Sequence, residues 1–442
     1  MDDNRTVIAA VTSRAVFSIA LPMTLAFLTT PLIGTVDTAV IGQYGEASLI
    51  GGLAVAALIF DVLFSTFNFL RTGTTGLTAQ ALGAGRRQDM AVTLLRALLL
   101  AAASGLLILA LMAPIRDAAL AFLDPGPAVA AAAVRYYDIR VLAAPLTLAN
   151  YALLGWVLGL GRSGVGLALQ TLLNGVNIAL SLILGLELGY GVEGIAWAAV
   201  IAEATAVIAG LLVALRLGRG TFRAVLPQVM DAKAFGRMIG VNRDIMIRSF
   251  ALLIAFAVFT RMGARFGDTV LAANAILMNF FMIGGYFLDG LAAAAEQLAG
   301  RAIGARQRDA FFSAVRLTVI WGFAFAGVAS AILWFFGDGL VALMTTAVDV
   351  RAVAATFLPW AALTPLAGVL AFQMDGVYIG ATWSRDMRNM MLLSLVAFLA
   401  LVFALVPVLG NHGLWLALLL FLGARGATLS WRLPRLAVTA FP

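Results

Sequence analysis

The sequence predicts an all-α polytopic membrane protein with twelve transmembrane helices in two six-helix lobes. Three observations predict this class. Hydrophobic residues make up 62% of the 442 residues and charged residues only 12%, whereas soluble proteins contain roughly 45–50% and about 25%. Apolar runs of about 20 residues or more, the length that a bilayer core requires, follow one another along the chain. The chain also contains an internal repeat whose offset is half its length.

The apolar runs place the spans in order. The first six are predicted at 14–42, 48–82, 90–113, 129–160, 165–188 and 190–216. After a polar interval, the second six are predicted at 242–264, 268–300, 311–337, 350–380, 388–409 and 411–431. The second and eighth runs are longer than the hydrocarbon core, so we expect their last turns to leave the membrane.

The basic residues indicate the orientation. Of the 29 Lys and Arg residues, twenty-two fall on one side of the predicted membrane, six on the other, and Arg71 within a span. Because cytoplasmic loops carry the excess of Lys and Arg, both termini are predicted to be cytoplasmic, in a bacterial inner membrane. The net charge of +7 is scattered over short loops, which argues against a nucleic-acid partner.

The repeat relates the two halves of the chain. The segment Ala81–Ala84 is echoed by Ala302–Ala305, and Gly155 and Gly159 match Gly376 and Gly380, all at an offset of 221. Six helices per half bring both halves into the bilayer from the same side, so the repeat is parallel, with a pseudo-twofold axis along the membrane normal. The predicted domains are a lobe at 1–217, a cytoplasmic interfacial linker at 218–241 and a lobe at 242–442. Two like lobes are typical of a transporter that works by alternating access, here expected to be a monomer in contact with membrane lipids.

Several chemistries are excluded. The chain has no cysteine and one histidine, His412, in a Gly-Asn-His-Gly turn. Thiol catalysis, a Ser-His-Asp triad and a zinc site therefore lack their residues. We expect no enzymatic activity, no metal site and no cofactor.

Ionisable residues inside the spans are the candidate functional residues, because burying them in a membrane is expensive. The acidic ones are Asp37, Asp61, Glu203, Asp289, Glu296 and Asp375. Arg71 is interpreted as the only deep base. This balance favours cationic substrates and argues against anionic lipid-linked sugars.

Asp37 ends a helix that contains Pro22 and Pro31, each of which deletes a backbone hydrogen bond. We predict that this helix bends and that Asp37 senses protonation. On the fifth span, Asn174, Asn177 and Ser181 share one helix face. They either line a substrate cavity or join neighbouring helices.

Three further acids and one base are given roles. Asp289 and Asp375 are either cavity carboxylates or paired structural charges. Arg71 and Glu296, near the cytoplasmic ends of spans two and eight, are predicted to pair as a gate. Glu203 and Asp61 are interpreted as structural.

Several motifs together resemble one transporter family. They are Pro31–Gly42, Phe69–Ala81, Asn242–Ile245, Asp375–Thr382, Met387–Asn389 and Gly410–Leu418. The chain looks like a member of the multidrug and toxic compound extrusion (MATE) family, in its DinF-like branch, within the MOP superfamily.

The resemblance implies an antiporter that exports amphipathic, mainly cationic xenobiotics against an inward cation gradient. In similar proteins the first-helix Asp, here Asp37, carries the coupling proton, and Pro22 is in the place of the proline that forms the kink. The polar cluster of the N-terminal lobe maps onto Asn177 and Asn150.

Two departures from the family favour protons over sodium. Many relatives have a second carboxylate where this chain has Ser181. Another branch completes a sodium site with an acid on the seventh span and one on the tenth, and here the seventh span has none between Asp244 and Asp268, although Asp375 is present. The rival interpretations are a lipid-linked oligosaccharide flippase of the same superfamily and a sodium-coupled drug antiporter.

Overall fold

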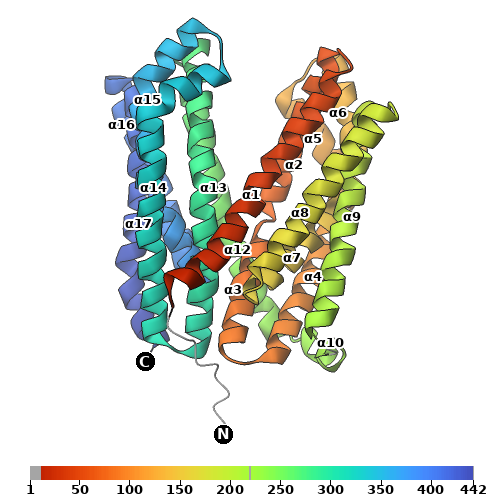
Figure 1. Ribbon diagram of the computed structural model, residues 1–442, viewed down its shortest axis with the longest axis vertical. Helices are drawn as coiled ribbons and strands as arrows, with labels where there is room; N and C mark the ends of the chain where they lie inside the picture. The colour runs from red at the N-terminus through yellow and green to blue at the C-terminus, as the bar shows by residue number, and fades with distance from the viewer. Residues whose placement is uncertain (1–10, 219–220, 442) are drawn as a thin grey trace. The chain divides into compact units, whose positions relative to one another are not determined.

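The computed structural model describes residues 11–218 and 221–441, and within these ranges twelve helical segments are long and apolar enough to cross a membrane (Figure 1). The predicted all-α class and the twelve spans are confirmed. Most ends agree with the prediction within a few residues. The seventh span, however, begins at Ala232 rather than at 242, the ninth continues to Met344 and the twelfth continues to Ala440. The first ten residues, which include the predicted cytoplasmic N-terminus, and linker residues 219–220 lie outside the described ranges.

The N-terminal half contains six of these spans. Its helices are α1 (Ser13–Gly42), α2 (Ala47–Thr66), α3 (Phe69–Gly83), α4 (Arg87–Ala110), α5 (Met112–Leu123), α6 (Pro127–Arg140), η1 (Val141–Ala143), α7 (Ala144–Gly159), α8 (Ser163–Leu180), η2 (Ser181–Glu187) and α9 (Gly191–Gly218). The helix α1 is continuous through Pro22 and Pro31, and the predicted bend at these prolines stays a prediction.

Two spans are interrupted rather than straight. The second span changes from α2 to α3 at Phe67, whose N–H donates to the Phe64 carbonyl in a tightened turn. The fourth span changes from α6 to α7 through the 3-10 turn η1, which ends two residues before Pro145. Pro145 has no N–H to donate to the Val141 carbonyl, which instead accepts from the Ala144 N–H in the tighter 3-10 pattern.

The short helix α5 was not predicted. None of its residues is buried, and Arg116 donates to Asp117 at 2.9 Å and to Asp138 at 2.8 Å. Hydrogen bonds from Asp117 and then Asp138 raise the pKa of Arg116 above its ordinary value. With 12 residues, α5 is too short to span a bilayer and has the form of an interfacial helix.

The predicted linker folds onto α4. It contains α10 (Thr221–Ala224) and α11 (Leu226–Val229), and both contact α4. The Arg96 side chain of α4 donates to the carbonyls of Gln228 (2.6 Å) and Val229 (3.0 Å). These carbonyls lie at the end of α11, where the Gln228 carbonyl also accepts from backbone N–H groups of the following turn. Arg96 thus ties this end of α11 to α4.

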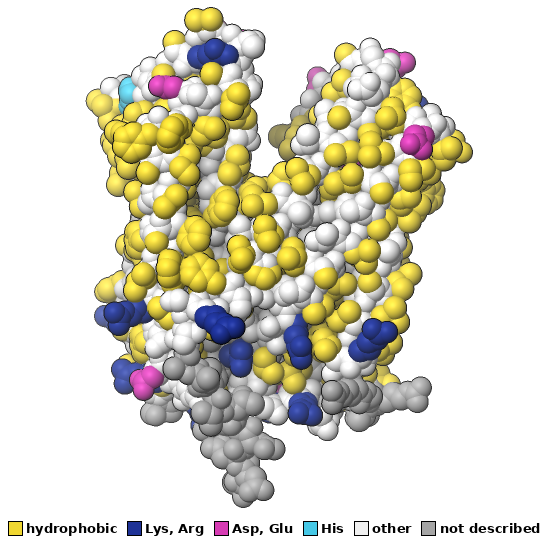
Figure 2. Space-filling view, viewed as in Figure 1, with side chains coloured by type: hydrophobic (Ala, Val, Ile, Leu, Met, Phe, Trp, Pro, Cys, Tyr) yellow, Lys and Arg dark blue, Asp and Glu magenta, His cyan; other side chains and the backbone are white. Residues whose placement is uncertain are grey.

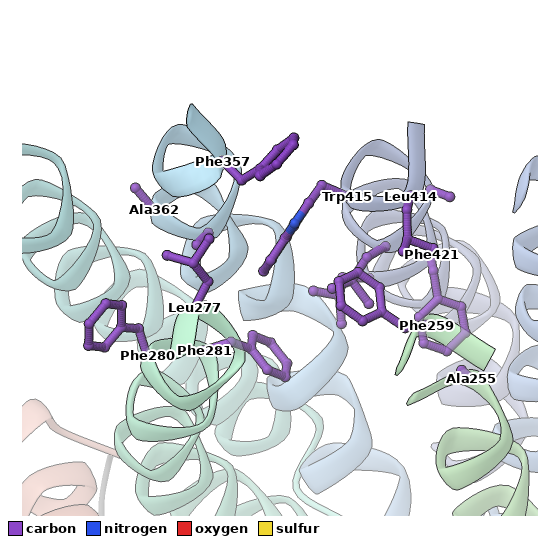
Figure 3. Close-up of a cluster of buried hydrophobic side chains, with 14 of the residues drawn as sticks. Ala255, Phe259, Leu277, Phe280, Phe281, Phe357, Ala362, Leu414, Trp415 and Phe421 are labelled. Atoms are coloured by element: carbon purple, nitrogen blue, oxygen red, sulfur yellow. The ribbon is translucent and has the colours of Figure 1, made fainter. Parts of the chain in front are cut away.

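The C-terminal half contains the other six spans. They are α12 (Ala232–Ala264), α13 (Asp268–Ala305), α14 (Arg308–Met344), α15 (Val348–Gly380), α16 (Ser384–Leu409) and α17 (Asn411–Ala440). Their core is aromatic, and Figure 3 shows Phe281 of α13, Phe357 of α15 and Trp415 of α17 among its members. The ring of Trp415 also packs edge-on against Phe259, with centroids 5.0 Å apart.

The described chain divides into two compact units. One contains α1 up to Thr24, Gly83–Gly85 and the chain from Gly240 onward, and the other contains Leu25–Leu82 and Arg86–Ile239. The start of α1 and the turn after α3 belong to the unit of the C-terminal half, and the predicted linker up to Ile239 belongs to the other unit. Pro22 lies two residues before the point at which α1 passes from one unit to the other.

The repeat is visible in the helix crossings inside each unit. A Cβ on Gly155 of α7 would lie 2.2 Å from the Arg71 carbonyl oxygen of α3, and a Cβ on Gly376 of α15 would lie 2.3 Å from the Ala292 carbonyl oxygen of α13. Both members of the second pair are 221 residues after those of the first. The repeat therefore preserves a backbone contact that only glycine allows.

Hydrophobic and basic side chains are distributed over the surface as in a membrane protein. Figure 2 shows hydrophobic side chains over the middle of each unit, while Lys and Arg side chains on this face gather mainly toward one end. This arrangement agrees with spans whose ends lie in an aqueous phase.

Candidate functional site

Asp37 lies in a polar row between α1 and α8. Its side chain is buried, with 5% exposed, and its Oδ1 accepts a hydrogen bond of 2.7 Å from the Ser181 hydroxyl. Asn177 Oδ1 lies 3.4 Å from the same hydroxyl. Among the described residues, no Lys or Arg forms an ion pair with Asp37. The structure thus brings together Asp37, Asn177 and Ser181, three residues singled out from the sequence.

The row continues one turn earlier along α8. Asn174 donates to the Thr29 hydroxyl of α1 at 2.7 Å and accepts from Gln170 at 3.1 Å. The Thr29 hydroxyl in turn donates to the Ala26 carbonyl. Asn174 therefore joins α1 to α8 while it is itself buried, which satisfies the interhelical interpretation of this residue.

The backbone changes character at Ser181. The α-helix α8 ends at Leu180, and Ser181–Glu187 form the π-helical segment η2. A π-helical turn inserts an extra residue and is frequent at functional sites. Here the segment begins at Ser181, the residue that donates to Asp37. The segment is held by the Tyr44 hydroxyl, which donates to the Gly185 carbonyl.

Asn150 belongs to a second polar group. Its amide donates to Glu203 of α9, at 2.6 Å to Oε2 and 3.0 Å to the backbone carbonyl. Thr147 donates to Glu203 Oε1 at 2.9 Å, and Arg140 lies 3.3 Å from the same oxygen. Arg140 is also within electrostatic range of Asp37. Glu203 is a paired, fully hydrogen-bonded charge, as its structural interpretation expects.

The two members of the predicted gate lie in different compact units. Arg71, at the start of α3, donates to Asn68 Oδ1 at 3.2 Å, and its guanidinium lies 5.8 Å from the Phe27 ring centroid. Glu296 is buried within α13. A pairing between Arg71 and Glu296 stays a prediction.

In the C-terminal unit Asp375 is not a free carboxylate. Arg248 of α12 and Arg425 of α17 both donate to Asp375 Oδ2. Asp289 of α13 is within electrostatic range of Arg425. Asp375 is therefore a paired charge, and its place in a substrate cavity stays a prediction.

This finding corrects the interpretation of Arg71 as the only deep base. Arg425 is 2% exposed and lies near the midpoint of α17, and Arg248 lies near the midpoint of α12. Both are among the twenty-two basic residues that the sequence predicts on the cytoplasmic side of the membrane. The interior is therefore less acidic than the sequence indicated, and the charge argument against anionic substrates loses its basis in this unit.

A further buried group joins two of the sequence motifs. Asp244 of α12 accepts from Arg388 of α16 at 2.5 Å and from the Ser384 hydroxyl at 3.3 Å. The sequence singled out Asn242–Ile245 and Met387–Asn389 only as motifs, without assigning a role to Asp244. Their joint presence was the one signal that they pack together.

Both halves of the chain match one family of known proteins. The MatE family model matches twice, at residues 22–183 and 245–406. The chain belongs to the MatE family. The two matches cover equivalent parts of the two halves, as the repeat requires.

Related proteins cover nearly the whole MatE chain. It is 40% identical to the DNA damage-inducible protein F of Escherichia coli over 423 residues, 95% of this chain and 92% of the relative. It is 24% identical to the probable multidrug resistance protein NorM of Bacillus anthracis, with 89% and 88% covered. A crystal structure of the Vibrio cholerae MATE transporter VcmN in the bent form superposes with a TM-score of 0.88 at 19% identity, with 97% of each chain covered. The two-lobe MATE fold and membership in a multidrug efflux transporter family follow.

Proposed function

We propose that the protein is a proton-coupled antiporter that exports amphipathic, mainly cationic compounds across the bacterial inner membrane. The observation that carries this proposal is the buried Asp37 with Ser181 as hydrogen-bond donor and no ion pair within the described chain. A buried carboxylate without a fixed counter-ion can be neutralised either by a proton or by a cationic substrate. Competition between the two for one carboxylate is sufficient to couple their movements in opposite directions.

Proton coupling is favoured over sodium by the ligands available. Near Asp37 the described chain offers one carboxylate, the Ser181 hydroxyl and the Asn177 amide oxygen. Hard metal cations need several oxygen ligands, usually more than one of them charged. In the other unit, Asp375 already neutralises part of the charge of two guanidiniums and so lacks the free charge that would attract sodium.

The transport cycle that we propose follows from this competition. Protonation of Asp37 from outside neutralises the site and releases the cation outward, and deprotonation toward the cytoplasm restores the affinity for the next one. The hydrogen bond from Ser181 favours the ionised carboxylate, because a hydroxyl donates best to a charged acceptor. Pro22 and Pro31 weaken the backbone hydrogen bonding of α1, so that this helix can respond to the change.

A direct test is substrate-induced proton release from purified protein. A cationic fluorescent substrate such as ethidium is added to weakly buffered protein in detergent, with and without sodium. We expect proton release from the wild type in both media and none from Asp37→Asn. Release that requires sodium, or release that persists in the Asn variant, would contradict coupling by protons at Asp37.

A lipid-linked oligosaccharide flippase remains the second candidate, and the buried Arg248 and Arg425 are the observation that favours it. Such a substrate carries a diphosphate, which arginines bind well. Liposomes that contain headgroup-labelled lipid separate the candidates: a flippase moves the label without a proton gradient, whereas the proposed antiporter moves ethidium only with one.

A further inference from the structure

The C-terminal unit contains a buried charge cluster that the proposed cycle does not use. Arg248 of α12, Asp375 of α15 and Arg425 of α17 meet at one carboxylate oxygen, Asp375 Oδ2. We call these three residues the Arg–Asp–Arg centre. Two of its members, Arg425 and Asp375, are 2% and 5% exposed. Charges at this depth are expensive and usually mark a functional site.

The hydrogen bonding of the centre is incomplete. Asp375 Oδ1 and the Nε atoms of Arg248 and Arg425 are buried and have no partner among the described residues. A guanidinium normally presents two parallel N–H groups to an oxyanion. Here each guanidinium donates to Asp375 through Nη2 alone, so the Nε donor of each remains unused. Buried polar groups without partners are rare and call for a missing water, ion or ligand.

The charges of the centre indicate the sign of that ligand. Two guanidiniums share one carboxylate, and the remaining acid within electrostatic range of Arg425 is Asp289, whose side chain is only partly buried. The centre itself holds two guanidiniums and one carboxylate, and Asp289 offsets part of the remaining positive charge from outside the centre. A cation would be repelled there, whereas an oxyanion would be attracted and would find two N–H donors without partners.

Helix packing at this level does not depend on the charges. A Cβ on Gly376, next to Asp375, would lie 2.3 Å from the Ala292 carbonyl oxygen of α13. One on Gly426, next to Arg425, would lie 2.4 Å from Leu370 Cβ and 2.8 Å from the Ala371 nitrogen of α15. Glycine contacts of this kind already hold α13, α15 and α17 together. The arginines are thus not required to hold these helices together.

We propose that the Arg–Asp–Arg centre binds the carboxylate or phosphate group of a transported amphipathic compound. The oxyanion uses the Nε donors of Arg248 and Arg425, and Asp375 weakens its binding by competing for the same guanidiniums. The chain then accepts compounds with an acidic group in addition to the cationic ones. This inference rests on the proposed export function and adds a substrate class to it.

A matched pair of dyes tests the proposal. Rhodamine 123 is the methyl ester of rhodamine 110, so the two differ in one carboxylate. Binding to the purified full-length protein in detergent is measured by fluorescence anisotropy at one pH, without a gradient. We expect Arg425→Gln and Arg248→Gln each to weaken rhodamine 110 binding about tenfold and to change rhodamine 123 binding less than about twofold. Asp375→Asn should strengthen rhodamine 110 binding, since it removes the competing charge.

Two control variants separate binding from folding. Arg432 pairs with Asp386 elsewhere on α17 and α16, so Arg432→Gln should leave both dyes unaffected. Arg425→Lys and Arg248→Lys keep the charge and should retain part of the preference for the acid. If Arg425→Gln is not recovered as a monodisperse protein, Arg248→Gln and the two Lys variants carry the test.

The outcomes are distinct. Equal weakening of both dyes would show that the centre is structural, and unchanged binding of both would show that water fills it, so either result overturns the proposal. Competition against rhodamine 110 alone by short-chain phosphatidylglycerol, but not by phosphatidylcholine, would support the site with a lipid headgroup as its ligand. Failure of the wild type to bind rhodamine 123 at all would instead contradict the proposed function.

Discussion

Asp37 accepts its hydrogen bond from a neutral hydroxyl, whereas Asp375 accepts from two guanidiniums. The first carboxylate keeps its charge available to a proton or a substrate, and the second has its charge neutralised within the protein. Two buried carboxylates on apolar helices thus differ in function because of the side chains that lie opposite them. This difference is invisible at the level of a single helix.

Substitution of Asp37 tests its role most directly. Asp37→Asn keeps the size of the side chain and mimics the neutral state, so we expect the protein to insert and fold but to lose export by more than about tenfold. Asp37→Glu should keep partial activity with a changed pH optimum. Ethidium efflux from cells and proton release from purified protein are the measurements.

Asp61 provides the matched control for that experiment. It lies on the neighbouring helix α2 and is exposed, so Asp61→Asn should retain export. Wild-type export by Asp37→Asn with its pH dependence intact would move the coupling site elsewhere.

Glu203 is expected to serve stability rather than transport. Removing one partner of a buried ion pair costs about 3–5 kcal/mol, and Glu203 accepts from Arg140, Thr147 and Asn150. Glu203→Ala should therefore lower the melting temperature in detergent strongly. Glu203→Gln, which keeps an acceptor oxygen, should lower it less. A stable Glu203→Ala protein without export would instead make Glu203 a transport residue.

At the scale of elements, the sequence predicted the positions of the helices better than the contacts between them. Hydrophobic runs located all twelve spans, because length in a bilayer is set by the runs themselves. The common face of Asn174, Asn177 and Ser181 followed from helical spacing, and α1 covers that face through Thr29 and Asp37. The helix α5 and the π-helical η2 were missed, because both depend on contacts that no local pattern encodes.

Arg248 and Arg425 show the same limit more clearly. Each lies on an apolar helix at a position that periodicity alone cannot assign to the interior or to a membrane surface. Both arginines lie in the interior because they pair with Asp375, which is 127 residues from Arg248 and 50 from Arg425. Pairing between distant helices is a tertiary choice, so the sequence located the acid and missed its bases.

The glycine crossings give an element-scale prediction. Gly155→Ala and Gly376→Ala each place a Cβ against a backbone carbonyl that cannot move alone, and overpacking of this kind costs about 1–3 kcal/mol. Both variants should melt earlier, and by similar amounts, because the two crossings are equivalent. Thermal unfolding in detergent measures the effect.

Gly175 and Gly327 are the controls for these substitutions. Neither has an atom within 4 Å of the added Cβ, so Gly175→Ala and Gly327→Ala should be neutral or slightly stabilising, as alanine is the better helix former. Equal losses at all four positions would mean that helix flexibility, not the close crossing, explains the result.

For the whole molecule, the basic residues predict the orientation in the membrane. The wild-type chain has no cysteine, so single cysteines can be introduced for labelling without first removing native ones. Cysteines at the exposed positions 86, 233 and 306 should resist impermeant maleimide in intact cells, and those at 46, 187 and 412 should react. Labelling of position 233 from outside would reverse the orientation.

The equivalent crossings of Gly155 and Gly376 have a consequence for how the two halves have diverged. Where two helix backbones are in contact, as at Gly155 and Gly376, only glycine fits, so both halves of a duplicated chain must keep it. Where side chains meet, each copy was free to change: one acquired Asp37 and Ser181, the other Arg248, Asp375 and Arg425. A deep mutational scan of the chain should accordingly be symmetric about the 221-residue offset at its glycines and asymmetric at its charges. In each half, the glycine contacts keep the helix packing, so the side chains elsewhere can change the substrate specificity without loss of the fold.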